Sequence, residues 1–208
     1  MSRLAQLMAI VVLALTGCGG SFFQTKAAPP ALYLLSARAV PAGAAAVTPL
    51  PADLAVLKPR VRAGLETDRI AALYPDRRLE YFADARWSGP LDEVIQQLAV
   101  QQFRASARFR DVSSDASVFA GDYWLEIEVT NFQAEYSAAA AAPPMVHVHL
   151  LGRVGTSAGR HMLAALEADA KEVASDNHLS AIVDAYNRAA DKALAEIVAG
   201  TVQALNAR

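Results

Sequence analysis

The 208-residue chain has one cysteine, four histidines and nearly balanced charge, with 19 Lys and Arg side chains against 21 Asp and Glu. A single cysteine excludes an intrachain disulfide. The lack of a basic excess argues against nucleic-acid binding, because proteins of that class carry clustered positive charge. Beyond the first 17 residues, no apolar run approaches the roughly 20 residues of a membrane-spanning helix. The first residues and the folded domain must therefore define the function.

The first residues have the pattern of an export signal. Arg3 precedes an apolar stretch at residues 4–15 that only Gln6 interrupts. The stretch is too short to cross a hydrocarbon core of about 30 Å as a helix. It therefore predicts a cleaved signal peptide and not a membrane anchor.

The residues that follow, Leu15, Thr16, Gly17 and Cys18, resemble the lipobox of bacterial lipoproteins. The resemblance implies cleavage between Gly17 and Cys18, a diacylglycerol on the Cys18 sulfur and an acyl group on the new amino terminus, with no other cofactor. Two or more acyl chains anchor a protein stably. The alternative is a plain secretory leader that happens to contain a cysteine. Because no Asp follows Cys18, the enterobacterial sorting rule favours the periplasmic face of the outer membrane.

Composition divides the chain into a signal peptide at residues 1–17, a lipidated tether at 18–30 and one periplasmic domain at 31–208. The tether is rich in small and polar residues and has little hydrophobic periodicity. Fully extended, it reaches roughly 40 Å. The remaining length suits a single domain. Inside it, a Pro- and Ala-rich loop is predicted at 41–51.

Short apolar runs predict strands at 32–35, 54–61, 70–74 and 79–83, with Pro59 at an edge or strand end. Strict alternation makes 122–135 the clearest strand, with Glu126 and Glu128 on a solvated face. Another strand is predicted at 145–154, with Val146 and Val148 on its buried side. Residues 160–170 fit either an Ala-rich helix or a third antiparallel strand, and the turn at 155–159 favours the strand.

Apolar residues at helical spacing predict two main helices, at about 90–106 and 177–204. Ser88 is the expected N-cap of the first helix, and Asp176 or Asn177 that of the second. The element order predicts an α+β fold, in which two helices pack on a largely antiparallel sheet in a single domain.

Two blocks carry a family resemblance. Residues 64–70 read Gly-Leu-x-Thr-x-Arg-Ile, and residues 81–87 read Tyr-x-x-x-x-Arg-Trp before a helix. With the lipobox, the early Tyr-Leu-Leu strand and the Ala-rich last helix, they resemble the ABC-type transport auxiliary lipoprotein family. The similarity extends over nearly all of the mature chain.

The resemblance implies a protein that is not an enzyme and that accompanies a permease, an ATPase and a mammalian-cell-entry (MCE) domain protein. Such systems move lipids between membranes, so the expected partners are the MCE protein and phospholipid. An alternative is a pilotin- or chaperone-like lipoprotein of another outer-membrane complex. A periplasmic enzyme is the third hypothesis, but the sequence has no nucleophile elbow and no phosphate-binding glycine loop.

Five residues are candidates for a partner or lipid surface. An Arg fork suits phosphate or carboxylate, so Arg69 and Arg86 are candidates, although each can equally pair with a nearby acid. Trp87 fits an interface or, more simply, the core. His147 and His149 share one strand face, which occurs in metal sites but lacks an evident third ligand here. A groove between the second helix and the sheet is a further candidate site.

Overall fold

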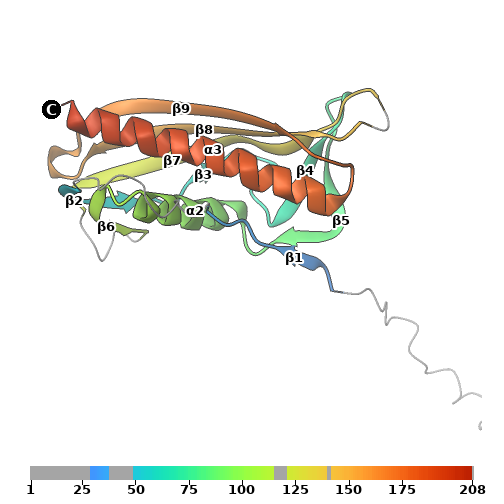
Figure 1. The fold of residues 1–208 in the computed structure, drawn as a ribbon, viewed down its shortest axis with the longest axis horizontal. Coiled ribbons are helices and arrows are strands. Elements are labelled where there is room, and N and C mark those ends of the chain that lie inside the picture. The colour runs from blue at the N-terminus through green and yellow to red at the C-terminus, as the bar shows by residue number, and fades with distance from the viewer. Residues whose placement is uncertain (1–28, 38–48, 115–120, 140–141, 208) are drawn as a thin grey trace, which may run out of the picture.

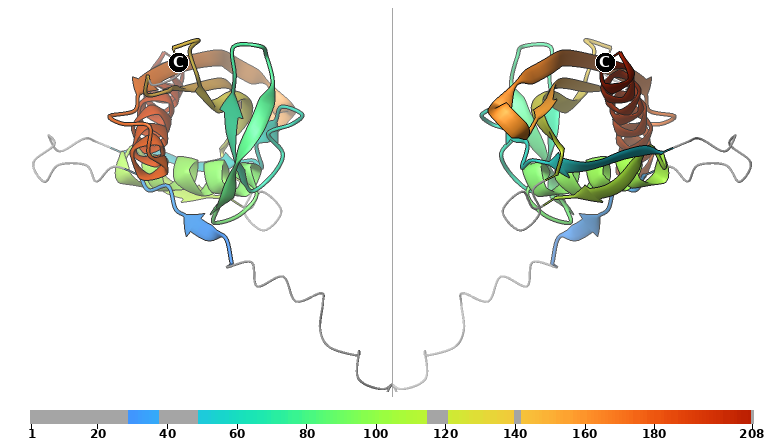
Figure 2. Two further views of the ribbon diagram at one scale, coloured as in Figure 1. Left: turned by 90° about the vertical axis from the view of Figure 1, so that its right-hand side faces the viewer. Right: turned by 90° about the vertical axis from the view of Figure 1, so that its left-hand side faces the viewer.

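The computed structural model describes residues 29–37, 49–114, 121–139 and 142–207. Within these ranges, nine strands form one mixed sheet and two long helices, α2 (Leu91–Ala105) and α3 (Leu179–Asn206), pack against it (Figure 1). Viewed end-on, the strands curve around one side of the molecule and the helices close the other (Figure 2). The predicted α+β class is confirmed. The signal peptide and most of the tether lie outside the described residues.

The largest part of the sheet is an antiparallel meander of β7 (Tyr123–Glu135), β8 (Met145–Thr156) and β9 (Met162–Val173). Its inner face is buried, and Val146, Val148 and Leu150 are 0% exposed. A short 3-10 turn, η1 (Ala158–Arg160), joins β8 to β9. Residues 160–170 are therefore mostly strand, as the preceding turn indicated.

The other edge of β7 pairs in parallel with three short strands in succession: β2 (Leu50–Val56), β3 (Arg60–Val61) and β4 (Arg69–Leu73). Beyond β2 lies β6 (Phe109–Ser113), also parallel. Beyond β4 lie β5 (Leu79–Trp87), antiparallel, and then β1 (Ala31–Tyr33), parallel to β5. The meander is thus antiparallel, whereas most short strands join the sheet in parallel.

Prolines shape the strands at the β2–β3 side. The run predicted at 54–61 is divided into β2 and β3, with Pro59 between them, because proline has no N–H to donate to the ladder. The predicted loop at 41–51 is wrong at its end, since Leu50 and Pro51 belong to β2. The register of β2 against β6 shifts between Leu50 and Asp53, and this irregularity accommodates the proline. The rest of that loop, residues 41–48, lies outside the described residues.

Both predicted helices exist, but the predicted caps are wrong. The N-caps are Pro90 and His178, and neither helix has a side-chain cap. The Ser88 N–H instead donates to the Tyr33 carbonyl at 3.0 Å, which ties this residue to the end of β1. Asn177 Oδ1 accepts a hydrogen bond from the Tyr136 hydroxyl at 3.0 Å. The Asn177 side chain therefore bonds to a residue beside the sheet and does not cap α3, and the N-cap of α2 is Pro90, two residues beyond Ser88.

An aromatic cluster joins the sheet to α3. Trp87 packs edge-on against Phe132 and Tyr186, with ring centroids 5.9 and 5.1 Å away. The Tyr186 hydroxyl donates to the Ala71 carbonyl at 2.6 Å. All three rings are at most 2% exposed. This cluster fixes the position of α3 against β4, β5 and β7.

Candidate functional site

The residues predicted for a partner or lipid surface lie in two places on the sheet. Arg69, Arg86 and Trp87 belong to the paired strands β4 and β5. His147 and His149 belong to β8, in the meander. The structure therefore does not bring the five residues into a single site, and each group has its own contacts.

The two arginines lie opposite each other, Arg69 on β4 and Arg86 on β5. Arg86 Nη1 donates to Asp68 Oδ1 at 2.7 Å, so Arg86 pairs internally with one of the acids considered from sequence. The Arg69 guanidinium lies over the Tyr81 ring, with Cζ 4.1 Å from the ring centroid. Such a cation–π contact is worth about 0.5–1 kcal/mol at an exposed site. Both arginines remain accessible while their side chains are held in place.

Trp87 is not part of a surface. Its side chain is 2% exposed and lies in the aromatic cluster under α3. The interface interpretation is wrong for this residue, because β5 turns its Trp87 position inward while Arg86 faces out. Its contribution is to core packing.

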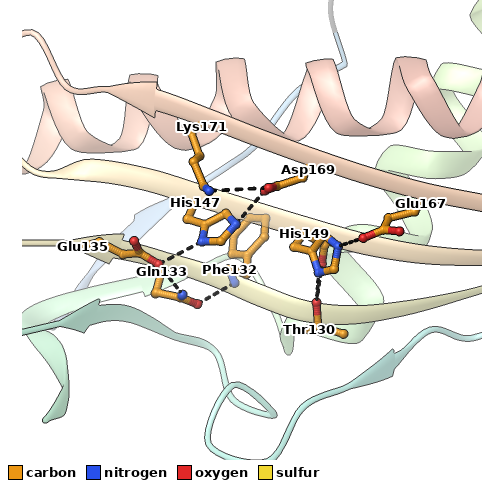
Figure 3. Close-up of polar contacts among 9 residues, drawn as sticks. All are labelled: Thr130, Phe132, Gln133, Glu135, His147, His149, Glu167, Asp169 and Lys171. Atoms are coloured by element: carbon orange, nitrogen blue, oxygen red, sulfur yellow. Dashed lines mark hydrogen bonds and ion pairs between the residues drawn. The ribbon is translucent and has the colours of Figure 1, made fainter. Parts of the chain in front are cut away.

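The two histidines each connect β8 to both neighbouring strands (Figure 3). His147 Nδ1 lies 2.9 Å from Glu135 Oε1 of β7, and Nε2 lies 2.6 Å from Asp169 Oδ1 of β9. Both ring nitrogens thus face carboxylates, one from each neighbouring strand. The imidazole is a polar link across three strands.

His149 repeats the arrangement one pleat away. Its Nδ1 lies 2.5 Å from Thr130 Oγ1 and its Nε2 lies 2.9 Å from Glu167 Oε1 (Figure 3). The side chains of His147 and His149 are only 15% and 21% exposed. Both are therefore more enclosed than two histidines on an open solvated face would be.

Electrostatics around His147 favour the ionised form of Asp169. Desolvation acts to raise the pKa of the Asp169 carboxyl, but the hydrogen bond and charge of His147 and the nearby Lys171 outweigh it. The pKa of Asp169 therefore lies below its usual 3.8. Lys171 Nζ approaches Asp169 Oδ2 at 3.4 Å. The polar side chains around Asp169 are thus paired with one another.

The carboxylates of this cluster were not identified from sequence. Period two along 145–154 and 160–170 would have placed Glu167 and Asp169 on the same outer face as the histidines, once the segments were paired as a meander. Glu135 could not be found in this way, because the register of β7 shifts between Val129 and Asn131 and reverses the alternation beyond that point. Among the described residues, no group of three or more His, Cys, Asp and Glu side chains has an arrangement that could hold a metal ion.

A groove of about 800 Å³ lies between the last turns of α2 and α3. Its α3 wall combines the apolar residues Ala195, Val198, Ala199 and Val202 with Gln203 and Asn206 at the end of the helix. The opposite wall includes Gln102 and Arg108. The sequence placed a groove between this helix and the sheet, but β8 and β9 pack directly against α3 and leave the opening on the α2 side.

In the described part of the chain, no helix is both long and apolar enough to span a membrane. The lipobox at Gly17 and Cys18 lies outside the described residues, so the cleavage and lipidation at that position remain predictions.

The protein thus contains a small α+β domain. Charged side chains pair with one another on its sheet, and a groove with an apolar wall lies between the ends of α2 and α3. The sequence model of the ABC-type transport auxiliary lipoprotein component family matches residues 33–198. The chain belongs to this family. Membership associates it with an ABC transport system and is consistent with a membrane-anchored, periplasmic location. The family description names an auxiliary component and no enzymatic activity.

Solved structures share the fold. A Xanthomonas campestris protein described under the family name DUF330 is 21% identical, with a TM-score of 0.73, over 85% of this chain and 98% of that one. An uncharacterized protein is 13% identical, with a TM-score of 0.63, over 83% and 98%. A hypothetical protein from Chlamydia trachomatis is 12% identical, with a TM-score of 0.51, over 76% and 100%. A search of the curated proteins found no match.

Proposed function

We propose that this protein is the lipid-anchored periplasmic accessory component of an MCE-linked ABC system that moves lipids between the two membranes. The observation that carries the proposal is the family match over residues 33–198, which spans eight of the nine described strands in full and most of α3. The protein acts by docking to its partners, and the energy for transport comes from the separate ATPase. The Cys18 lipid holds it on the periplasmic face of the outer membrane.

The α2–α3 groove is the surface that we propose for the MCE partner. Alanine and valine line its α3 wall up to Val202, before Gln203 and Asn206, and let another apolar segment approach the helix closely. Arg108 gives the opposite wall one positive charge that is half-buried and has no hydrogen-bond or ion-pair partner among the described residues. An apolar partner segment that carries a carboxylate complements both features.

Crosslinking in intact cells, followed by purification of the lipidated protein from membranes and identification of co-purifying proteins, tests the function. An MCE-domain protein is expected to co-purify with the wild type. Ala199→Glu, which places a charge in the groove, is expected to abolish its capture. Ala165→Glu, at an exposed alanine of β9, is the matched control and should leave capture unchanged.

A different outer-membrane assembly, captured repeatedly without any MCE protein, would refute the transport role and favour the pilotin- or chaperone-like alternative. Equal capture by both variants would refute the groove as the docking surface while leaving the transport role intact.

A further inference from the structure

Two leucines beside the start of the domain are left largely uncovered by the residues that the structure describes. Leu32 and Leu34 are 64% and 74% exposed, whereas Tyr33 and Leu35, which alternate with them, pack against the core. β1 lies at the periphery of the fold and pairs only with β5 (Figure 1). The alternation thus presents two large apolar side chains to solvent at the point where the domain begins.

The side chains next to these leucines are those of an interfacial surface. Leu32 is in register with Arg86, and Arg86 is in register with Arg69, so the three lie in one row on the same face. Arg69 covers the Tyr81 ring. Leucine, arginine and tyrosine are residues that proteins place at the boundary between bilayer and water.

The length of chain between Cys18 and β1 limits how far this surface can lie from the predicted lipid anchor. From Cys18 to Leu32 the chain spans at most about 50 Å, even when fully extended. A flexible tether of that length gives a second membrane contact an effective concentration on the order of millimolar. Two leucines that bind a bilayer too weakly by themselves therefore gain a lasting contact when the Cys18 lipid is already inserted.

We infer that Leu32 and Leu34 insert into the leaflet that holds the Cys18 lipid, so that β1 is a second membrane contact and fixes how the domain is oriented on the bilayer. The inference rests on the lipid anchor of the proposed function but not on its MCE partner. Because Arg86 is already paired with Asp68, the contact is mainly apolar and forms on zwitterionic as well as anionic lipid. Insertion reaches the headgroup and acyl boundary, about 5–10 Å deep.

The full lipidated protein, reconstituted in phosphatidylcholine vesicles with brominated acyl chains, tests this contact. Cys18 is the only cysteine and acylation consumes its thiol, so one introduced cysteine takes a thiol-reactive fluorophore specifically. Labelled L34C is expected to be quenched several-fold more than labelled V173C. Val173 is the matched control, since it is 61% exposed and lies at the end of β9.

A second pair of proteins removes the influence of the label. With the fluorophore at S36C, quenching is expected when both leucines are present and is expected to disappear in the Leu32→Ser/Leu34→Ser variant. Equal quenching at positions 34 and 173 would overturn the inference. No partner protein is present, so that result would leave the docking function intact. Mass spectrometry that finds no acyl chains on the purified protein would also overturn the inference, because the tether would then not be attached to a membrane.

Discussion

The two faces of β8 place unlike chemistry on consecutive residues of one strand. Val146, Val148 and Leu150 point inward and are fully buried beneath α3, whereas His147 and His149 point outward to carboxylates of β7 and β9. The inner face is stabilised by burial of apolar surface, which is insensitive to pH. The outer face is stabilised by hydrogen bonds to carboxylates, and the lowered pKa of Asp169 makes its contribution depend on pH. Substitutions on the two faces should therefore differ in size and in pH dependence.

The largest effect is expected from Trp87→Ala on the inner side. Removal of this buried ring from its contacts with Phe132 and Tyr186 should lower the free energy of unfolding by about 3–5 kcal/mol. Urea-induced unfolding followed by circular dichroism measures the loss. Trp124→Ala is the control, because Trp124 is only half-buried, and its cost should be clearly smaller. Similar losses for the two variants would mean that Trp87 is not a central core residue.

Tyr186→Phe should give the next largest effect. It removes the hydroxyl that donates to the Ala71 carbonyl and leaves a buried acceptor unpaired, at about 1–3 kcal/mol. Burial holds the pKa of Tyr186 well above its usual 10.0. The unfolded tyrosine ionises near pH 10, so the stability due to this residue is complete below that pH and declines as the pH rises further.

Denaturant titrations at pH 8 and above pH 10 measure this dependence. The wild type should lose stability more steeply than Tyr186→Phe over that interval. Tyr81→Phe, which removes a hydroxyl bonded to the Gly64 carbonyl at an exposed site, should retain the steep decline. Parallel curves for wild type and Tyr186→Phe would contradict the expectation.

On the outer face, His147→Ala should cost about 0.5–1.5 kcal/mol at pH 5. It removes the link between Glu135 and Asp169. The lowered pKa of Asp169 stabilises the fold above pH 3.8 and its contribution is lost as the pH falls through the still lower folded value. The cost of the substitution should therefore shrink below that range, as measured by thermal unfolding across pH.

His178→Ala is the control for the outer face. The His178 side chain is 82% exposed, and its ion-pair contact with Asp176 is long at 3.8 Å. The substitution should change the melting temperature little at any pH. A pH-independent loss for His147→Ala would show that the ring acts by packing alone.

The smallest effects are expected where apolar side chains are exposed. Leu34→Ser and Val173→Ser should each change the free energy of unfolding by no more than about 0.5 kcal/mol. Chemical denaturation measures both. A loss above 1 kcal/mol for Leu34→Ser, on the order of a buried contact, would show that this leucine packs within the domain and would weaken the case for membrane insertion.

The sequence predicted those parts of the fold that depend on periodicity. Alternation placed β7 and β8, the buried side of β8 and that of β7 as far as Val129, and apolar spacing placed α2 and α3. Beyond Val129 the register of β7 shifts, so that Phe132 and Ala134 are buried, which alternation alone does not predict. β6 escaped prediction because its two buried residues, Phe109 and Val112, are three positions apart and do not alternate. The predicted Asn177 cap failed because its side chain bonds to Tyr136 near the end of β7, which local sequence does not bring close. The Ser88 cap failed because α2 begins later, with Pro90 at its N-cap.

The candidate sites were less predictable for the same physical reason. His147 and His149 were identified as a pair, but their partners on β9 depend on the register of β8 against β9. Trp87 was assigned to either core or surface because one aromatic residue before a helix fits both. An internal acid was expected as one possible partner of Arg86, but the choice of Asp68 depends on the register of β4 against β5.

The parallel pairing of β2, β3 and β4 with β7 has a consequence for export. A chain that crosses a membrane from its amino terminus delivers these three strands before β7, their common partner, has emerged. The hairpin of β4 and β5 can form locally. In contrast, β2 and β3 cannot pair with β7 until the segment that ends at Glu135 has emerged. Parallel strands joined through long crossovers form slowly. If the chain is exported in this way, the strands of the first third of the domain keep open edges until β7 has emerged.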